Sequence, residues 1–183
     1  MLKEFLLTFK SIWVRAPLFF NSNSNLKHGM RDLFEGGLCV PVLVYWNDNI
    51  VAVSTSDYIS VFHDFMQTFS DIIQTEKPTK NNGISFLPPI LDKIQGKDAF
   101  LNWELQQSGL FQIILNGGFR QATLMYKRKA VRYGIVSVIE LYDLSTYGSE
   151  LQEIAADQPA IVQKFNEIAE NEIIPSFLKR SQT

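Results

Sequence analysis

The chain has 183 residues, of which 46% are hydrophobic and 20% are charged, a composition typical of a folded globular protein. Its net charge of -2 gives no case for binding nucleic acid, and its single cysteine, Cys39, excludes an internal disulfide and a Cys-rich zinc site. No apolar run approaches the ~18 residues that a membrane span requires. From the net charge we expect no nucleic-acid partner, and from the short apolar runs we expect no membrane span.

The first 37 residues give little regular pattern. A short apolar stretch at residues 5–9 is interrupted by Lys10, and no small-residue cleavage site follows it. This stretch therefore predicts a packed helix or strand rather than a signal peptide. Residues 17–37 are rich in Asn, Ser and Gly, which is typical of an irregular loop.

An α/β pattern follows. Residues 40–46 are almost continuously apolar, which predicts a strand buried on both faces. A helix is expected over residues 57–75, capped by Ser56 or Asp57. Its apolar stripe has helical spacing and consists of Ile59, Phe62, Phe65, Met66, Phe69, Ile72 and Ile73. Residues 76–98 read as a linker-like crossing with one short helix at 89–95.

The last third predicts a small antiparallel sheet and a covering helix. The expected strands are 100–105, 111–115, 119–126, 130–133 and 135–142, with a hairpin turn at Asn116-Gly117-Gly118. The basic residues 127–129 are expected at a solvated hairpin tip rather than at an anion site. A helix is predicted from Pro159, with its apolar face toward the sheet, to an end or kink at Pro175.

These patterns carry no chemistry by themselves. There is no Gly-rich phosphate loop, no nucleophile elbow and no metal-spaced His or Cys set. His28 and His63 are far apart in the sequence, and His63 lies at the edge of the helix stripe, where a ligand role is not expected. Cys39 is expected to be a small buried hydrophobic side chain.

Three stretches carry a more specific signal. Residues 26–37 read Leu-Lys-His-Gly-Met-Arg-Asp-Leu-Phe-Glu-Gly-Gly, with Val-Pro at 40–41. Residues 83–88 read Gly-Ile-Ser-Phe-Leu-Pro, and residues 139–146 read Ile-Glu-Leu-Tyr-Asp-Leu-Ser-Thr. In this order they resemble L-R-G-x-K-R-D-L-Y-E-G-G-x-R-V-P, D-G-I-S-F-L-P and E-L-Y-D-L of the C-terminal region of formylglycine-dependent, arylsulfatase-type sulfatases.

The resemblance implies an α/β fold of the alkaline-phosphatase-like superfamily. The chain would be a C-terminal fragment of that sulfatase fold, ending in a small antiparallel sheet with a packed C-terminal helix. We therefore expect three parts. Residues 1–16 would be an unrelated or disrupted N-terminus, residues 17–80 the end of the sulfatase α/β domain, and residues 81–183 the C-terminal α+β subdomain.

The resemblance also implies a catalytic apparatus of which this chain carries almost nothing. Intact family members use a formylglycine made from Cys or Ser in C/S-x-P-S-R, together with a calcium ion held by Asp and Asn oxygens. Here Cys39 is followed by Val40, Pro41 and Val42, which breaks that motif. We therefore expect no catalytic residue, no metal ligand and no cofactor in this chain.

Four further positions follow from the resemblance. The family lysine that clamps the sulfate is matched by Met30, which carries no charge and cannot donate to a sulfate oxygen. Trp103, Glu104 and Gln121 are expected at the substrate subsite by position, although core packing of Trp103 and a structural role for Glu104 are equally compatible with the sequence.

The expected function is that of a sulfatase-family protein, since intact members hydrolyse aryl sulfates or sulfated saccharides. This chain itself is expected to be a truncated, inactive C-terminal piece of such a protein. Two alternatives remain open: half of a split sulfatase completed by a separate N-terminal chain, and a non-catalytic module that binds sulfated glycans. Met30 argues against the split enzyme, and the balance of 17 basic against 19 acidic residues argues against the glycan-binding module. Intact members are often secreted or periplasmic, but the compartment stays open here.

Overall fold

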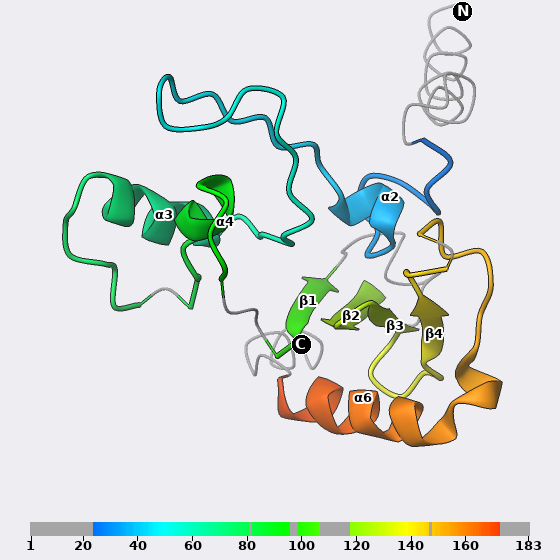
Figure 1. Cartoon of the computed structure of the whole chain (residues 1–183). Coiled ribbons are helices and arrows are strands. Elements are labelled where there is room, and N and C mark those ends of the chain that lie inside the picture. Colours follow the sequence, from blue (N-terminus) through cyan, green and yellow to red (C-terminus); the bar gives the residue numbers. More distant parts are fainter. Residues whose placement is uncertain (1–23, 81, 96–98, 107–117, 147, 173–183) are drawn as a thin grey trace, which may run out of the picture. The chain divides into compact units, whose positions relative to one another are not determined.

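The computed structural model describes residues 24–80, 82–95, 99–106, 118–146 and 148–172. Contacts divide the chain into two compact units, one made of residues up to Val40 and from Ala99 onward, the other of Pro41–Asp98 (Figure 1). The sequence predicts a boundary near residue 80 instead. The contacts differ because residues 27–37 pack on the sheet that is built from residues after 99.

The first unit contains the predicted antiparallel sheet, which has four strands among the described residues where the sequence predicts five. Its strands are β1 (Leu101–Gln106), β2 (Phe119–Met125), β3 (Arg128–Tyr133) and β4 (Glu140–Asp143), paired in that order. Trp103 lies opposite Ala122, and Glu104 lies opposite Gln121. The strand expected at 111–115 lies outside the described residues, and only the end of the stretch 135–142 forms a strand.

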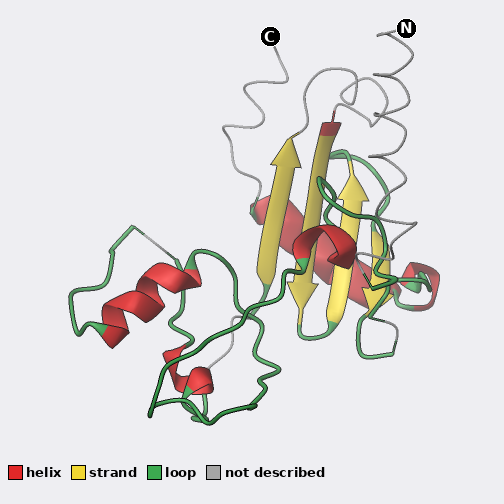
Figure 2. Cartoon of the chain, turned by 90° about the horizontal axis from the view of Figure 1, so that it is seen from above, coloured by secondary structure: helices red, strands yellow, loops and turns green. Residues whose placement is uncertain are grey.

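The two faces of this sheet are covered by different elements (Figure 2). Helix α2 (Glu35–Leu38) and the residues before it cover one face, and α6 (Pro159–Asn171) covers the other. Side chains alternate between the faces, as the strand period of two requires. On β3, Val131 belongs to the core cluster with Phe34, whereas Ala130 belongs to the cluster with Phe165.

Helix α6 confirms the predicted C-terminal helix. It begins at Pro159, after the short 3-10 helix η2 (Ala155–Asp157), and buries Phe165 and Ala169 against the sheet. Near its end, the carbonyl oxygen of Ala169 accepts hydrogen bonds from Gln121 Nε2 at 3.0 Å and Arg132 Nη2 at 3.4 Å. These donors satisfy a carbonyl in the last turn of the helix. Residues 173 and 175 of the predicted helix lie outside the described residues.

The second unit contains α3 (Asp64–Ile72) and α4 (Leu87–Ile90). Both helices are shorter than predicted. Helix α3 follows His63 rather than a cap at Ser56 or Asp57, and α4 begins two residues before the expected helix. The polar face of α3 is its buried face, because Asp64 Oδ1 and Thr68 Oγ1 accept the backbone N–H groups of Ile84 and Phe86 at 2.9 and 3.0 Å.

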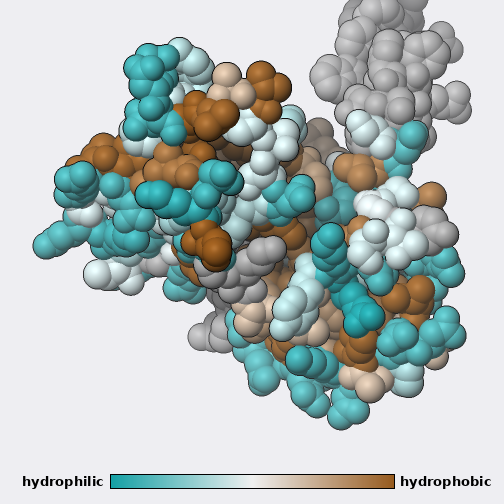
Figure 3. Space-filling view, in the orientation of Figure 1, coloured by the Kyte–Doolittle hydropathy of each residue, from teal (hydrophilic) through white to brown (hydrophobic). Residues whose placement is uncertain are grey.

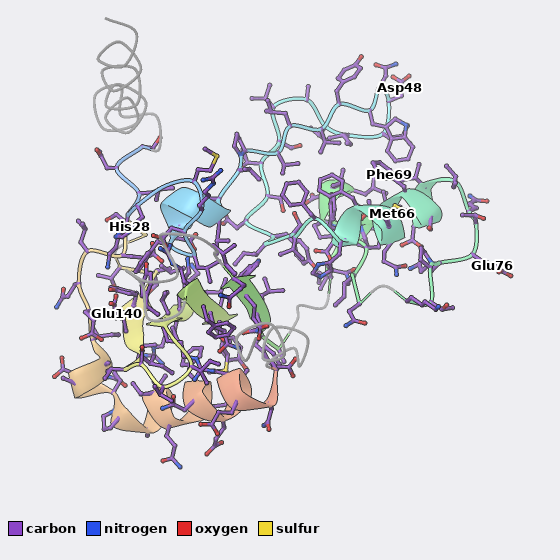
Figure 4. The ribbon with its side chains drawn as sticks, turned by 180° about the vertical axis from the view of Figure 1, so that it is seen from behind. His28, Asp48, Met66, Phe69, Glu76 and Glu140 are labelled. Carbon is purple, nitrogen blue, oxygen red and sulfur yellow. The ribbon has the colours of Figure 1, made fainter. Side chains whose placement is uncertain are left out.

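Most of the predicted apolar stripe of α3 is exposed in this structure. Five of its members are more than half exposed: Ile59, Phe62, Met66, Phe69 and Ile73. Figure 4 shows two of them, Met66 and Phe69, on this helix. Apolar surface also gathers over this unit in the space-filling view (Figure 3). Hydrogen bonding to the segment 83–86 therefore decides which face of α3 is buried.

The prediction of a buried strand at residues 40–46 is wrong. These residues are irregular, and Leu43 is 97% exposed. A strand needs a partner for its backbone N–H and C=O groups, and no other described segment pairs with this one.

None of the helices among the described residues has the length and apolar character needed to cross a membrane.

Candidate functional site

Residues 27–37, which we call the docking loop, lie over the α2 face of the sheet and are fixed there by charged side chains. Asp32 contacts Arg120 of β2 and Tyr133 of β3, and Glu35 contacts Lys129 of β3. Both acidic residues belong to the Arg-Asp-Leu-Phe-Glu stretch that the sequence singles out. The stretch therefore positions a surface loop on a rigid sheet.

Asp32 is the centre of the first cluster. Its Oδ1 accepts hydrogen bonds from the Tyr133 hydroxyl and the Leu33 N–H, both at 2.8 Å. Its Oδ2 lies 3.1 Å from Arg120 Nη1 and 2.6 Å from His28 Nδ1. Burial, and then the hydrogen bond to Asp32, raise the pKa of Tyr133, so this phenol stays protonated as a donor. The fixed carboxylate orients the imidazole of His28.

Aromatic rings support the same corner of the site. The His28 and Phe34 rings lie 4.7 Å apart, and Figure 4 places His28 beside α2. Lys27 Nζ lies 4.0 Å from the centre of the Phe34 ring and donates to the Tyr142 hydroxyl at 2.6 Å. The Tyr142 hydroxyl donates in turn to the Glu140 carboxylate. The start of the docking loop is thus held by a cation–π contact and a polar chain.

Lys129 forms a second, buried ionic cluster. It is 0% exposed, and its Nζ lies 2.6 Å from Glu35 Oε1 and 2.9 Å from Glu150 Oε1. Glu150 Oε2 also accepts the backbone N–H of Glu35 at 2.7 Å. Burial raises the pKa of the Glu150 carboxyl, although the hydrogen bond from the Glu35 N–H and the charge of Lys129 act to lower it.

This cluster corrects one prediction. The basic residues 127–129 do not all lie at a solvated tip, because strand alternation places Lys129 on the covered face, whereas Lys127 is exposed. Glu150, which completes the cluster, has a left-handed backbone conformation with φ 53°.

Two glycines allow the docking loop to close on itself. A Cβ on Gly37 would lie 2.3 Å from the Asp32 carbonyl oxygen and 2.6 Å from that of Gly29. A Cβ on Gly36 would lie 2.5 Å from the carbonyl oxygens of Lys27 and His28. All of these distances are far below van der Waals contact. Glycine is therefore required at both positions of the Glu-Gly-Gly sequence for α2 to pack against the start of the loop.

The structure separates the predicted substrate residues. Met30 is 85% exposed on the docking loop, and Trp103 packs on the core cluster of the same sheet face. Glu104 and Gln121 come together on the α6 face, where Gln121 Nε2 donates to Glu104 Oε1 at 3.2 Å and Gln121 Oε1 accepts from Arg132 Nε at 2.8 Å. The substrate role of Trp103, Glu104 and Gln121 stays a prediction.

Cys39 differs from its expected place in the core. The residue is exposed just after α2, and its thiol donates to Glu35 Oε2 at 2.7 Å. Burial of the sulfur atom, followed by the hydrogen bond to Glu35, raises the pKa of this thiol to about 12. The thiol therefore stays protonated at neutral pH, where only a thiolate would act as a nucleophile.

The described residues do not fit the calcium ion that the family resemblance implies. Within them, no group of three or more His, Cys, Asp or Glu side chains is arranged to hold a metal. The acidic side chains of the docking loop are paired instead with Arg120 and Lys129. Calcium requires six to eight oxygen ligands, which this arrangement does not offer.

Sequence reasoning missed the polar residues that fix the docking loop. They lie in the docking loop or contact it from the sheet and from the turn before residue 150: Asp32, Glu35, Arg120, Lys129, Tyr133 and Glu150. The available signal was a charge at a strand position that alternation places on a buried face, as at Arg120 and Lys129. A buried charge requires a partner, which points to the acidic residues of the loop.

No protein-family model matches the sequence, and no curated protein matches it. Solved structures do match. A Bacteroides thetaiotaomicron protein, BT33336S-sulf, solved in work on the metabolism of multiple glycosaminoglycans, has a TM-score of 0.60 and 16% identity over 81% of this chain and 32% of that chain. The chain has the fold of the C-terminal part of a sulfatase.

A second solved structure is similar over a smaller part of the chain. The protein BT4656, solved in complex with its substrate D-glucosamine-2-N,6-O-disulfate, has a TM-score of 0.55 and 18% identity over 69% of this chain and 27% of that chain. A third, the 2-O GAG sulfatase BT1596, has a TM-score of 0.48 and 17% identity over 63% and 24%. The chain spans about a third or less of the length of these structures.

Proposed function

We propose that this chain belongs to a sulfatase-type protein that acts on a sulfated saccharide, and that its own residues bind the saccharide rather than cleave the sulfate ester. The observation that carries the proposal is the similarity of the fold to BT33336S-sulf over 81% of this chain and to BT4656 over 69% of it. BT4656 was solved with a disulfated glucosamine, and we infer the same class of ligand for this chain.

The residues on the docking loop support recognition rather than cleavage. Met30 occupies the position where the resemblance implies a sulfate-clamping lysine, and a thioether cannot donate to a sulfate oxygen. Cys39 is not in the motif that gives formylglycine, and burial of its sulfur atom, together with the hydrogen bond to Glu35, raises the pKa of its thiol. Formylglycine and calcium are expected of the intact family.

Among the three predicted substrate residues, we assign the saccharide contact to Trp103. It lies on the sheet face that carries the docking loop, where it is only partly buried against the core cluster, and the rest of a tryptophan ring offers an apolar surface to a sugar ring. Glu104 and Gln121 lie on the other face, where the hydrogen bond between their side chains ties β1 to β2. Their contribution would be to the position of Trp103.

Titration calorimetry of the whole chain tests this function. We expect D-glucosamine-2-N,6-O-disulfate to bind at least ~10-fold more tightly than unsulfated D-glucosamine, because the charge-assisted hydrogen bonds of a sulfate are about twice as strong as neutral ones. Equal affinities, or no binding of either sugar, would overturn the proposal. An aryl sulfate incubated with the chain should release no sulfate above a heat-killed control.

The exposed tip of the docking loop offers a gain-of-binding test. Met30→Lys adds a cation at a side chain that is 85% exposed, so we expect several-fold tighter binding of the disulfate and no change for D-glucosamine. Met66→Lys is the matched control, because Met66 is also exposed but lies on α3 in the other unit. An equal gain from both variants would show a general charge effect and would count against the placement of the site.

A further inference from the structure

We propose that the exposed apolar face of α3 is the interface of a two-fold symmetric dimer, in which α3 packs antiparallel against α3 of a second copy of this chain. This face, which we call the α3 face, consists of Phe62, Met66, Phe69 and Ile73. The proposal concerns only the unit of residues 41–98 and does not depend on the function proposed above.

The α3 face is large for a surface that is left uncovered. Each of its four side chains is more than half exposed, from 54% at Phe69 to 77% at Phe62. They expose roughly 500 Å² of apolar surface in each copy. Monomeric proteins rarely expose contiguous apolar patches larger than a few hundred Å², and larger patches mark interaction surfaces. Two copies would bury about 1,000 Å² in total, which is the size that a specific interface requires.

Hydrogen bonds on the opposite side of the helix keep the α3 face turned outward. The Asp64 Oδ1 atom accepts the Ile84 N–H at 2.9 Å, and the Thr68 Oγ1 atom accepts the Phe86 N–H at 3.0 Å. Rotating α3 to bury its apolar face inside the unit would take both acceptors away from these backbone N–H groups. The α3 face is therefore covered only from outside the unit.

Aromatic contacts fix two members of the face before any partner binds. The ring of Phe65, which is half-buried, lies 6.2 Å from the ring of Phe62 and 6.0 Å from that of Phe69. On its other side Phe65 meets Phe86 edge-on, with ring centres 5.0 Å apart. Because these rings are already held in place, association costs less side-chain entropy than it would with free rings.

The spacing of the α3 face makes it complementary to itself. Its members follow one another at intervals of four, three and four residues, an order that reads the same in both directions along the helix. In an antiparallel pair, Phe62 therefore faces Ile73 of the second copy, and Met66 faces Phe69 of the second copy. A two-fold axis requires a patch that complements itself in this way. Antiparallel helices also bring opposite dipole ends together.

No charged side chain of the helix opposes this pairing. At 100° per residue, Asp64 and Asp71 lie on the side of α3 opposite to the α3 face. The residues that border the face around the helix are Phe65 and Ile72 on one side and His63 and Ser70 on the other. An apolar centre without like charges, bordered partly by polar residues, has the composition of a protein–protein interface.

Sedimentation equilibrium of the whole chain over a range of concentrations tests the dimer. We expect a reversible monomer–dimer equilibrium, and Phe69→Asp should weaken it at least ~30-fold, because an aromatic side chain at the centre of an interface is a hot spot. Leu43→Asp is the matched control, since Leu43 is 97% exposed in the same unit but lies outside the α3 face. This variant should keep the affinity of the unchanged chain.

Cross-linking tests the antiparallel arrangement in a Cys39→Ser background. In the proposed pair the two copies of residue 66 lie about 4.5 Å apart along the helix axis, whereas the two copies of residue 73 lie about 16 Å apart. A short bismaleimide should therefore join Met66→Cys chains into dimers and leave Ile73→Cys chains unjoined. Efficient cross-linking at both positions would indicate parallel helices and would overturn the antiparallel pair.

The unchanged chain gives an answer that no misfolded variant can mask. A chain that stays monomeric at ~100 µM has no second copy on its α3 face, and the dimer is then overturned. Slow hydrogen exchange of α3 in such a monomer would show that a different occupant covers the face. Equal weakening of the dimer by Phe69→Asp and Leu43→Asp would place the interface elsewhere and would also overturn the proposal.

Discussion

Replacing Lys129 with Met is expected to lower the free energy of unfolding by ~3–5 kcal/mol. The substitution leaves Glu35 and Glu150 facing each other without the cation that they share, at a position where the Glu150 side chain is 0% exposed and that of Glu35 is 17% exposed. Breaking a buried ion pair by removing one partner costs far more than losing an exposed pair. Lys127→Met is the matched control, since Lys127 lies two residues away and is exposed.

Urea unfolding measures this difference. Trp103 lies on β1, so it reports on the sheet when Trp13 and Trp46 are replaced by Phe. We expect a lower midpoint for Lys129→Met and a change within ~0.5 kcal/mol for Lys127→Met. Similar midpoints for the two variants would show that the buried cluster does not hold the docking loop to the sheet.

The second large effect is expected from Gly37→Ala. The new Cβ would lie 2.3 Å from one backbone carbonyl and 2.6 Å from another, and neither can move without opening the turn 29–32. The expected loss is about 3 kcal/mol, at the upper end of the cost of overpacking. It should exceed the small gain that alanine brings to a helix.

Gly29→Ala is the control for this steric argument. Gly29 lies in the same loop, but a Cβ there would meet nothing within 4 Å. Its unfolding midpoint in urea should stay close to that of the unchanged chain, whereas that of Gly37→Ala should fall. A loop that tolerates alanine at both positions would contradict the close packing of α2 against residues 27–32.

The sequence predicts the elements whose signals are local. The antiparallel strands follow from alternating residues and turn signals, and α6 follows from Pro159 and an apolar stripe that includes Phe165. These signals act between neighbours in the chain, so they can be read without tertiary contacts. The sulfatase fold itself was predicted from the resemblance of residues 26–37, 83–88 and 139–146.

The rest depends on partners far apart in the sequence. The Tyr133 hydroxyl finds Asp32 across 101 residues, and no periodicity reveals such a pair. The apolar pattern of α3 predicts a helix correctly, but Asp64 and Thr68 bury its polar face by accepting backbone N–H groups. The apolar run at 40–46 predicts that its side chains are buried, but the run itself does not indicate which element would cover them.

Segment-resolved hydrogen exchange, with and without D-glucosamine-2-N,6-O-disulfate, tests the central claim most directly. The claim is that the docking loop on the sheet is the saccharide-binding part of a sulfatase-type fold. The ligand should slow exchange in residues 27–37 and in β1, while residues 41–95 keep their rates. A gain of protection confined to residues 41–95, or no change anywhere at saturating ligand, would contradict it.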